Sequence, residues 1–265
     1  MVEECTFSFA GKESIDYGMF VINAGSLPNT LVSGADTEII STDLSRRSSK
    51  LIYGVKENNG LKFDITLSLP KNCAFDTICN IKDWLFGHTS PQKLKFEHPD
   101  LRDYYFLCYF RYGDDFHNGD KYNAIKVSVE CVSPYAYKQN VSFVVSGSSP
   151  TSVWIETAEL YGTQPIVEFS IPSGNPNEVS LLNQSSDTCL KLVPTTGFPL
   201  VVGTRVIINN QKKLVLFNYN SALKHLSFEN NCGFLSLVNG MNIFEGTDGV
   251  DMTITYTPTK RIGGV

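Results

Sequence analysis

The stretch that decides the fold runs from residue 231 to residue 258 and reads NCGFLSLVNGMNIFEGTDGVDMTITYTP. Apolar residues lead up to Gly240, and a glycine-rich turn follows at Gly246–Gly249. After that turn, apolar and polar residues alternate over Met252–Thr257. Because successive side chains of a strand point to opposite faces, the alternation predicts a strand with one buried face. The stretch therefore predicts the closing hairpin of a β-sandwich.

The second half of the chain, residues 139–265, has the same character throughout. Short apolar-rich segments follow one another, turns such as Pro172–Pro176 separate them, and no segment has helical spacing. Short strands at this spacing are typical of a β-sandwich or a jelly roll. We expect strands at Val141–Val145, Ser152–Thr157, Pro165–Ile171, Asn177–Leu182, Cys189–Leu192, Arg205–Asn209, Lys213–Tyr219, Phe234–Leu237 and Met252–Thr257.

The first half, residues 1–138, reads as strands around one helix. Strict alternation at Leu61–Leu69 and at Ile125–Cys131 predicts two strands with one buried face each. Tyr104–Tyr112 has apolar residues on both faces, which predicts a central strand or a strand at an interface. We expect shorter strands at Thr6–Phe9, Met19–Ile22, Lys50–Val55 and Leu94–Phe96.

One segment of the first half has helical spacing. The apolar residues of Phe75–Phe86 recur on one side of a helix. Asn72 is placed to cap the start of this helix, and Gly87 is placed to end it. The sequence thus predicts a single helix packed on a β-domain.

The segment Thr30–Ser49 differs from its surroundings because it is polar and has no sustained period. So long a stretch without secondary structure is uncommon in a compact domain unless it is functional or disordered. Ile39, Ile40 and Leu44 give it apolar anchors. It is therefore either a solvated loop or an arm that lies on a neighbouring subunit.

Composition limits the classes of function. The chain has 265 residues, 42% of them hydrophobic, which allows one large or two small domains. A net charge of −5 argues against a protein that grips nucleic-acid phosphates through a basic face. No apolar run approaches the ~20 residues of a membrane span, and the acidic amino terminus lacks a signal-peptide pattern. The seven cysteines are irregularly spaced, so we expect free, mostly buried thiols in a reducing compartment, without a disulfide.

No catalytic motif is evident, whether a G-x-S-x-G, a phosphate-binding glycine loop or an H-E-x-x-H. The polar cluster Asp114–Asp120 offers carboxylates to a divalent cation, but its flanking glycines favour a hairpin connection. Glu97–Asp100 reads as an acidic turn rather than an acid–base pair. Trp154 is expected in core or interface packing, with stacking on a sugar ring as the alternative. We therefore expect no catalytic residue, no metal and no cofactor.

Five motifs in order along the chain resemble those of siphophage-type distal tail proteins. Residues 7–19 (FSFAGKESIDYGM) are similar to the family's opening F-x-F-x-G-x-x-S-x-x-[FY]-G-L. Trp84-Leu85 with residues 94–100 (LKFEHPD), residues 131–137 (CVSPYAY) and residues 162–169 (GTQPIVEF) resemble its middle motifs. The carboxyl-terminal signature is matched by Phe234, Leu237, Gly240, Asn242, Ile243, Ile254, Tyr256 and Pro258.

One motif departs from the family. Many relatives carry I-P-G-R-x-G before the third strand, whereas this chain has Ile40 followed by DLSRRSS at residues 43–49. Arg46 and Arg47 are the candidates to replace the contacts of that motif. The interface contacts of relatives therefore do not transfer directly to this chain.

The resemblance implies a mainly β protein of two domains. Residues 1–138 would form a tail-tube-like β-sandwich or barrel with one α-helix, and residues 139–265 a galectin-like β-sandwich. Proteins of this family form a hexameric ring at the distal end of the tail tube. As a hub, the ring joins the tube to tip or baseplate proteins, and DNA passes its lumen without specific binding. The implied location is the virion tail tip, after assembly in the host bacterial cytoplasm.

The partners implied are other copies of the chain, the tail tube protein, a tail-associated or tip protein, and receptor-binding or other baseplate proteins. For the ring interface we nominate Ile39, Ile40, Leu44, Arg46, Arg47, Tyr105 and Tyr109. An alternative function is a carbohydrate-binding, lectin-like protein of a phage adsorption apparatus. A glycan-cleaving enzyme that uses scattered carboxylates is a third possibility.

Overall fold

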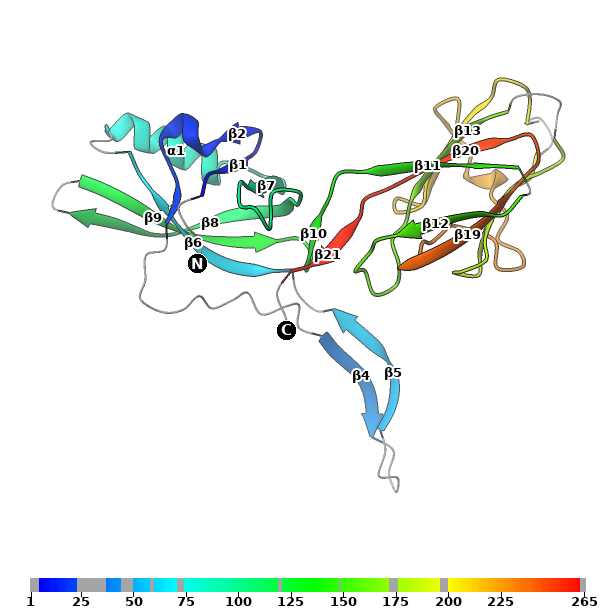
Figure 1. Ribbon diagram of the computed structural model, residues 1–265, viewed down its shortest axis with the longest axis horizontal. Helices are drawn as coiled ribbons and strands as arrows, with labels where there is room; N and C mark the ends of the chain where they lie inside the picture. Colours follow the sequence, from blue (N-terminus) through cyan, green and yellow to red (C-terminus); the bar gives the residue numbers. More distant parts are fainter. Residues whose placement is uncertain are drawn as a thin grey trace. The chain divides into compact units, whose positions relative to one another are not determined.

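The computed structural model describes residues 5–22, 37–43, 50–57, 60–70, 74–118, 121–147, 149–171, 176–195 and 200–262. The chain divides into two compact units, each described here by itself (Figure 1). The first unit comprises Met1–Lys138 and Arg261–Val265, and the second comprises Gln139–Lys260.

The first unit is built on a seven-stranded antiparallel sheet in the order β2-β1-β7-β8-β9-β6-β3. Its described strands do not close into a barrel, because β2 and β3 remain at opposite edges. The strands are β1 (Phe7–Phe9), β2 (Lys12–Glu13), β3 (Val21–Ile22), β6 (Lys62–Ser68), β7 (Gln92–Phe96), β8 (Phe106–Asn118) and β9 (Lys121–Cys131). Also present are the 3-10 helix η1 (Ser14–Tyr17), helix α1 (Phe75–Phe86) and β10 (Tyr135–Tyr137).

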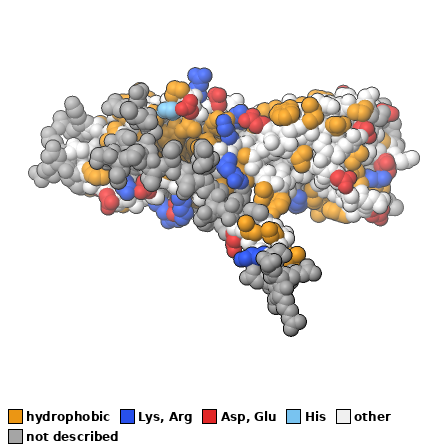
Figure 2. Space-filling model, turned by 60° about the horizontal axis from the view of Figure 1, so that its bottom comes forward, with side chains coloured by type: hydrophobic (Ala, Val, Ile, Leu, Met, Phe, Trp, Pro, Cys, Tyr) orange, Lys and Arg blue, Asp and Glu red, His pale blue; other side chains and the backbone are white. Residues whose placement is uncertain are grey.

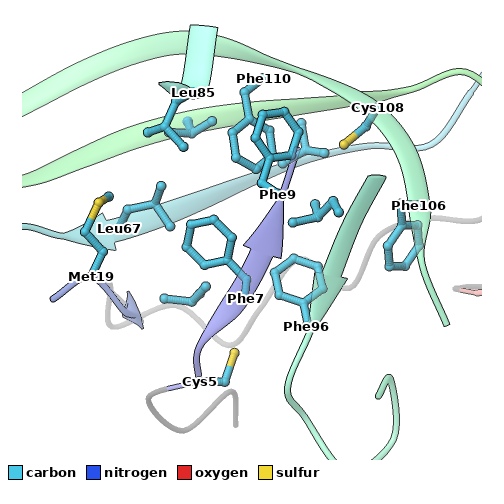
Figure 3. Packing of buried hydrophobic residues seen from close by; sticks show 14 of the residues in the cluster. Cys5, Phe7, Phe9, Met19, Leu67, Leu85, Phe96, Phe106, Cys108 and Phe110 are labelled. Carbon is cyan, nitrogen blue, oxygen red and sulfur yellow. The ribbon is translucent and has the colours of Figure 1, made fainter. Parts of the chain in front are cut away.

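Aromatic packing holds α1 onto this sheet. The rings of Phe9 and Phe110 stack at 4.0 Å between centroids, and the indole N–H of Trp84 donates to the Phe9 carbonyl at 3.0 Å. Figure 3 shows Phe7, Phe9 and Phe110 gathered in the core, with Leu85 of the helix beside Phe110. The helix has the predicted bounds and ends at Gly87, whose N–H donates to Asp83. The predicted cap is wrong, since Ala74 is the N-cap; Asn72 lies outside the described residues.

β8 lies in the middle of the sheet, as its two apolar faces predicted. The prediction that Asp114–Asp120 is only a hairpin connection is wrong, because β8 continues to Asn118 and β9 begins at Lys121. The pairing shifts register between Tyr112 and Asp115, which absorbs an irregular stretch without ending the strand. Residues 119–120 lie outside the described residues.

The second unit is a sandwich of two antiparallel sheets. One sheet has the order β11-β20-β13-β16-β17-β18 and the other the order β12-β19-β14-β15. The first consists of β11 (Val141–Ser146), β13 (Ile166–Ser170), β16 (Arg205–Asn209), β17 (Leu214–Phe217), β18 (Asn220–Ser221) and β20 (Asp251–Tyr256). The second consists of β12 (Thr151–Ile155), β14 (Val179–Asn183), β15 (Thr188–Leu192) and β19 (Gly240–Gly246). The 3-10 helix η2 (Leu223–His225) and β21 (Thr259–Arg261) complete the elements.

The closing stretch of the sequence does not form the predicted hairpin. β19 pairs with β12 and β14, whereas β20 pairs with β11 and β13, so the chain crosses from one sheet to the other. Both strands do alternate, and they bury Phe244 and Ile254 in the same core from opposite sides. The predicted strand Phe234–Leu237 is also wrong, because Leu237 makes only an isolated bridge to Thr163.

Asn242 explains why an asparagine follows Gly240 in the carboxyl-terminal signature. Its fully buried amide oxygen accepts from Asn183 Nδ2 at 2.8 Å and from the Val238 N–H at 3.1 Å. Its amide nitrogen donates to the Val238 carbonyl at 2.7 Å and to the Gly240 carbonyl at 3.1 Å. Gly240 itself has a φ of 98°, which favours glycine. The motif is therefore a turn held by one buried side chain.

Candidate assembly interface

The hairpin β4 (Thr37–Asp43) and β5 (Lys50–Glu57) forms a two-stranded sheet of its own. The prediction that Thr30–Ser49 lacks secondary structure is therefore wrong for Thr37–Asp43. β-branched residues of TEIIST favour a strand, and pairing with β5 satisfies the backbone. A register shift between Ile40 and Ser41 twists the ribbon.

Large apolar side chains of the hairpin lie exposed on both of its faces. Ile39 and Ile40 are adjacent in β4, so their side chains point to opposite faces, and they are 59% and 47% exposed. In β5, Leu51, Ile52 and Tyr53 are likewise consecutive and exposed. Figure 2 shows hydrophobic side chains on the hairpin with charged side chains near them. An apolar ribbon of this kind has no buried face of its own.

Such a ribbon gains stability only when another surface covers it. A single two-stranded hairpin is at best marginally stable in water. Burying apolar area contributes about 25 cal/mol per Å², so covering several large side chains would stabilise the hairpin by several kcal/mol. The geometry thus matches an arm that inserts between other protein surfaces.

The other nominated interface residues lie apart from the hairpin ribbon or outside the described residues. Leu44, Arg46 and Arg47 lie outside the described residues. Tyr105 is partly buried, its ring stacks on Tyr137 at 5.6 Å, and the two residues exchange backbone hydrogen bonds. Burial and then the neighbouring Tyr137 raise the pKa of Tyr105. Tyr105 is thus built into its own unit.

Tyr109 lies on the face of β8 that is opposite the core, directly across from Glu130 of β9. On this face Glu130 accepts from Lys62 at 3.0 Å and from Arg111. Arg111 and then Lys62 lower the pKa of Glu130. Lys126 pairs with Asp64 at 2.9 Å on the same face. The face is therefore a ladder of alternating charges rather than an apolar patch.

The polar cluster around Asp115 is a structural ion pair. Lys82 of α1 donates to Asp115 at 2.9 Å, which fastens the helix to β8. Burial would lower the pKa of Lys82, but the hydrogen bond and the charge of Asp115 outweigh it and raise that pKa. Within the described residues no three His, Cys, Asp or Glu side chains are grouped closely enough to hold a metal ion.

Trp154 is 68% exposed, which rules out core packing, whereas interface packing and stacking on a sugar ring stay predictions. It lies on β12, an edge strand, directly across from Met241 of β19, which is also exposed. Ser152 is exposed on the same face, two residues earlier. The second unit therefore presents a small aromatic and apolar surface to solvent.

Comparison with known proteins shows what the chain is similar to. A family described as phage tail protein N-terminal domain matches residues 3–133. No curated protein matches the chain. The crystal structure of the Dit protein (gp 19.1) of phage SPP1 is similar, and its title calls it a paradigm of the hub adsorption apparatus in phages that infect Gram-positive bacteria. The likeness covers 97% of this chain and 100% of that one, with a TM-score of 0.70 and 13% identity.

These comparisons bear out the resemblance seen in the sequence motifs. The mainly β fold with a galectin-like second half is confirmed, because the likeness extends over both units. In the described part of the chain, no helix is both long and apolar enough to cross a membrane. Residues 3–133 therefore match a phage tail protein N-terminal domain, and the chain has a fold like that of the SPP1 Dit protein.

Proposed function

We propose that this protein is the hub at the distal end of a phage tail, where it forms a hexameric ring. The observation that carries the proposal is the likeness of nearly the whole chain to a protein whose title names a hub adsorption apparatus. On this proposal the ring joins the tail tube to tip and baseplate proteins, and receptor-binding proteins attach around it. The chain works as a structural part without catalysis, and it assembles in the host cytoplasm.

The ring would be built through the first unit, with residues 1–138 as its tail-tube-like, ring-forming domain. A ring needs a head-to-tail contact in which one surface of each copy meets a different surface of the next. The β4–β5 hairpin supplies one of these surfaces, because both of its faces are apolar and exposed. We propose that it lies on a neighbouring copy, where covering the ribbon offsets the cost of ordering it. Ile39 and Ile40 are then interface residues.

The proposed passage of DNA is compatible with the charges of the described sheet face. Phosphates bind lysine and arginine strongly, so a channel for DNA must keep such groups neutralised. On the outer face of β6, β8 and β9, Lys62 and Arg111 share the carboxylate of Glu130, and Lys126 pairs with Asp64. The chain also has a net charge of −5. We propose a neutral to acidic lumen without specific nucleic-acid binding, which the net charge supports.

A substitution in the hairpin tests the ring contact. Ile52→Glu places a charge on a side chain that is 62% exposed in the single chain, so the monomer should fold unchanged. In the ring the same carboxylate would be buried without a partner, which costs several kcal/mol at every interface. Light scattering should then report a hexamer for the wild type and a monomer for Ile52→Glu.

Val144→Glu is the matched control, because Val144 is a β-branched strand residue that is 51% exposed in the second unit. Circular dichroism of both variants should match the wild type. The control should keep the hexamer. If Ile52→Glu assembles as well as Val144→Glu does, the hairpin is not an interface element.

A second candidate function is carbohydrate binding by the sandwich of the second unit. The observation that favours it is Trp154, whose exposed ring has Met241 and Ser152 beside it on one sheet face. Aromatic rings exposed in this way offer an apolar surface on which a sugar ring can stack. Binding of the wild type but not of Trp154→Ala on a glycan array would support this function. Equal signals from both proteins would exclude it at this site.

A further inference from the structure

Two cysteines that are far apart in the sequence lie side by side in the second unit. The Cys189 N–H donates to the Asn231 carbonyl at 3.3 Å, and the Gly233 N–H donates to the Cys189 carbonyl at 2.7 Å. These two bonds flank Cys232, which therefore sits directly beside Cys189 in a parallel bridge. Paired residues of neighbouring strands project their side chains to the same face, so the two thiols lie next to each other. We infer that Cys189 and Cys232 form a disulfide when the protein leaves a reducing medium.

The backbone geometry suits such a bond. Laterally paired residues of neighbouring strands lie about 4.7–4.9 Å apart, and a disulfide requires a Cα separation of roughly 4.4–6.8 Å. Because the bridge places both side chains on the same face, the bond can form without a rearrangement of β15. Both cysteines carry free thiols in this structure, which therefore shows the reduced form.

Access to solvent separates this pair from a second pair of neighbouring cysteines. Cys108 of β8 and Cys131 of β9 are also register partners. They are only 0% and 8% exposed, so an oxidant in solution reaches them only when the sheet opens. Cys189 and Cys232 are partly exposed and can react in the folded protein.

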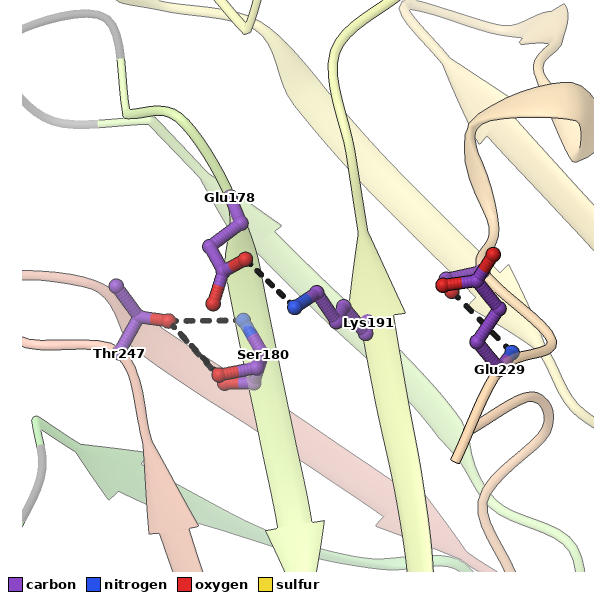
Figure 4. A network of polar contacts seen from close by, with 6 residues as sticks. Glu178, Ser180, Lys191, Glu229 and Thr247 are labelled. Carbon is purple, nitrogen blue, oxygen red and sulfur yellow. Dashed lines mark hydrogen bonds and ion pairs between the residues drawn. The ribbon is translucent and has the colours of Figure 1, made fainter. Parts of the chain in front are cut away.

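The surroundings of Cys189 disfavour its thiolate. Burial, and then the neighbouring Cys232, raise the pKa of Cys189 to about 12. Lys191 would lower that pKa, but its ammonium group is held by Glu178 at 2.6 Å, as Figure 4 shows. The reaction starts at whichever thiol of the pair loses its proton, and the other cysteine then resolves the intermediate.

The oxidant is a low-molecular-weight disulfide such as oxidised glutathione. The thiolate of one cysteine attacks one of its sulfurs, which forms a mixed disulfide and releases one thiol of the oxidant. The sulfur of the other cysteine then attacks the first, loses its proton, and releases the second thiol. The protein gives up two electrons and two protons, and the oxidant takes up both to become two thiols.

The disulfide would hold in place the segment between η2 and β19, which is not part of a strand. The chain between η2 and β19 is held to its neighbours by isolated bridges, and Asn230 and Asn231 within it have left-handed backbone conformations. A link from Cys232 to Cys189 ties this segment to the edge strand β15. The pair would be reduced during assembly and oxidised after release, and this order of events rests on the proposed virion location. The ability of the two cysteines to form the bond is independent of that location.

Native full-length protein, incubated with oxidised glutathione, tests the inference. Thiol titration after quenching and denaturation should show a loss of two thiols per chain, and peptide mapping by mass spectrometry should find Cys189 joined to Cys232. The mapping uses the unaltered chain and so does not depend on how a variant folds. A bond between Cys108 and Cys131, a lasting glutathione adduct on Cys232, or no loss of thiols would overturn the inference.

Substitution of single cysteines tests whether Cys189 takes part in the disulfide. Cys189→Ser should abolish the intramolecular link and leave a glutathione adduct on Cys232. Cys79→Ser is the matched control, because Cys79 is also partly exposed but lies in α1 of the first unit. This control should still lose two thiols per chain. Loss of two thiols in Cys189→Ser would mean that another cysteine is the partner. The result is independent of the ring, so a monomeric protein that forms this bond leaves the inference intact while contradicting the hub.

Discussion

Asn242 provides a sharp test of how the closing stretch holds the second unit together. Asn242→Ala removes a fully buried amide that takes part in four hydrogen bonds, to Asn183, to Gly240 and twice to Val238. A typical hydrogen bond contributes about 0.5–1.5 kcal/mol, and a buried partner left unsatisfied costs about 1–3 kcal/mol. Asn183 keeps a second acceptor, the Ser236 carbonyl at 2.9 Å, which limits the loss. We expect a destabilisation of roughly 3 kcal/mol.

Differential scanning calorimetry of the full chain measures how far the substitution lowers the unfolding temperature of the second unit. For a unit of this size, 1 kcal/mol corresponds to a shift of roughly 3–6 °C, so the transition of the second unit should fall by on the order of 10 °C. The transition of the first unit should not move. Asn140→Ala is the matched control, because its amide accepts a hydrogen bond from Thr257 at 2.8 Å on the exposed surface. It should cost less than ~0.5 kcal/mol. An Asn242→Ala shift no larger than the control's would refute the structural role of the motif.

Three further substitutions test separate parts of the structure. Gly162→Ala should lower the free energy of unfolding, measured by urea titration, by at least ~1 kcal/mol more than Gly203→Ala. Both glycines have positive φ, but of the two only Gly162 has a carbonyl that the new Cβ would meet, at 2.3 Å. Glu130 has a lowered pKa in the folded state, so its contribution is present above its unfolded pKa of about 4.3 and is lost as pH falls. Glu130→Gln should therefore melt below the wild type at pH 6, and the two curves should converge toward pH 3. Trp154→Ala should change the free energy of unfolding by less than ~0.5 kcal/mol, because the side chain is 68% exposed; a larger loss would mean that the ring is packed.

Local periodicity accounts for the elements that sequence reasoning placed well. Helix α1 has the predicted bounds, Phe75–Phe86, because its apolar stripe and Gly87 are both local signals. β16 at Arg205–Asn209 and the alternation of β20 were likewise readable, since a buried face requires a period of two. These signals say which side of an element is buried. They carry no information about which strand lies next to it.

The errors concern long-range pairing. β19 and β20 are consecutive and both alternate, yet they belong to different sheets because the core needs Phe244 and Ile254 from opposite sides. Cys189 and Cys232 are brought together by a lateral bridge, which their spacing in the sequence does not encode.

At the candidate interface, the anchors Ile39 and Ile40 were identified from the sequence, and the structure places both on the exposed ribbon. The strand that carries them was missed, because polar neighbours obscure its period. Its partner strand also lies beyond a polar stretch of the chain. Whether a second copy covers this ribbon is a property of the assembly, which one chain's sequence does not encode.

Negative-stain electron microscopy of the purified full-length protein tests whether this chain is a ring-forming tail hub. We expect particles with six-fold symmetry and a central hole. Particles that remain monomeric at micromolar concentration, both alone and with tail tubes added, would contradict it.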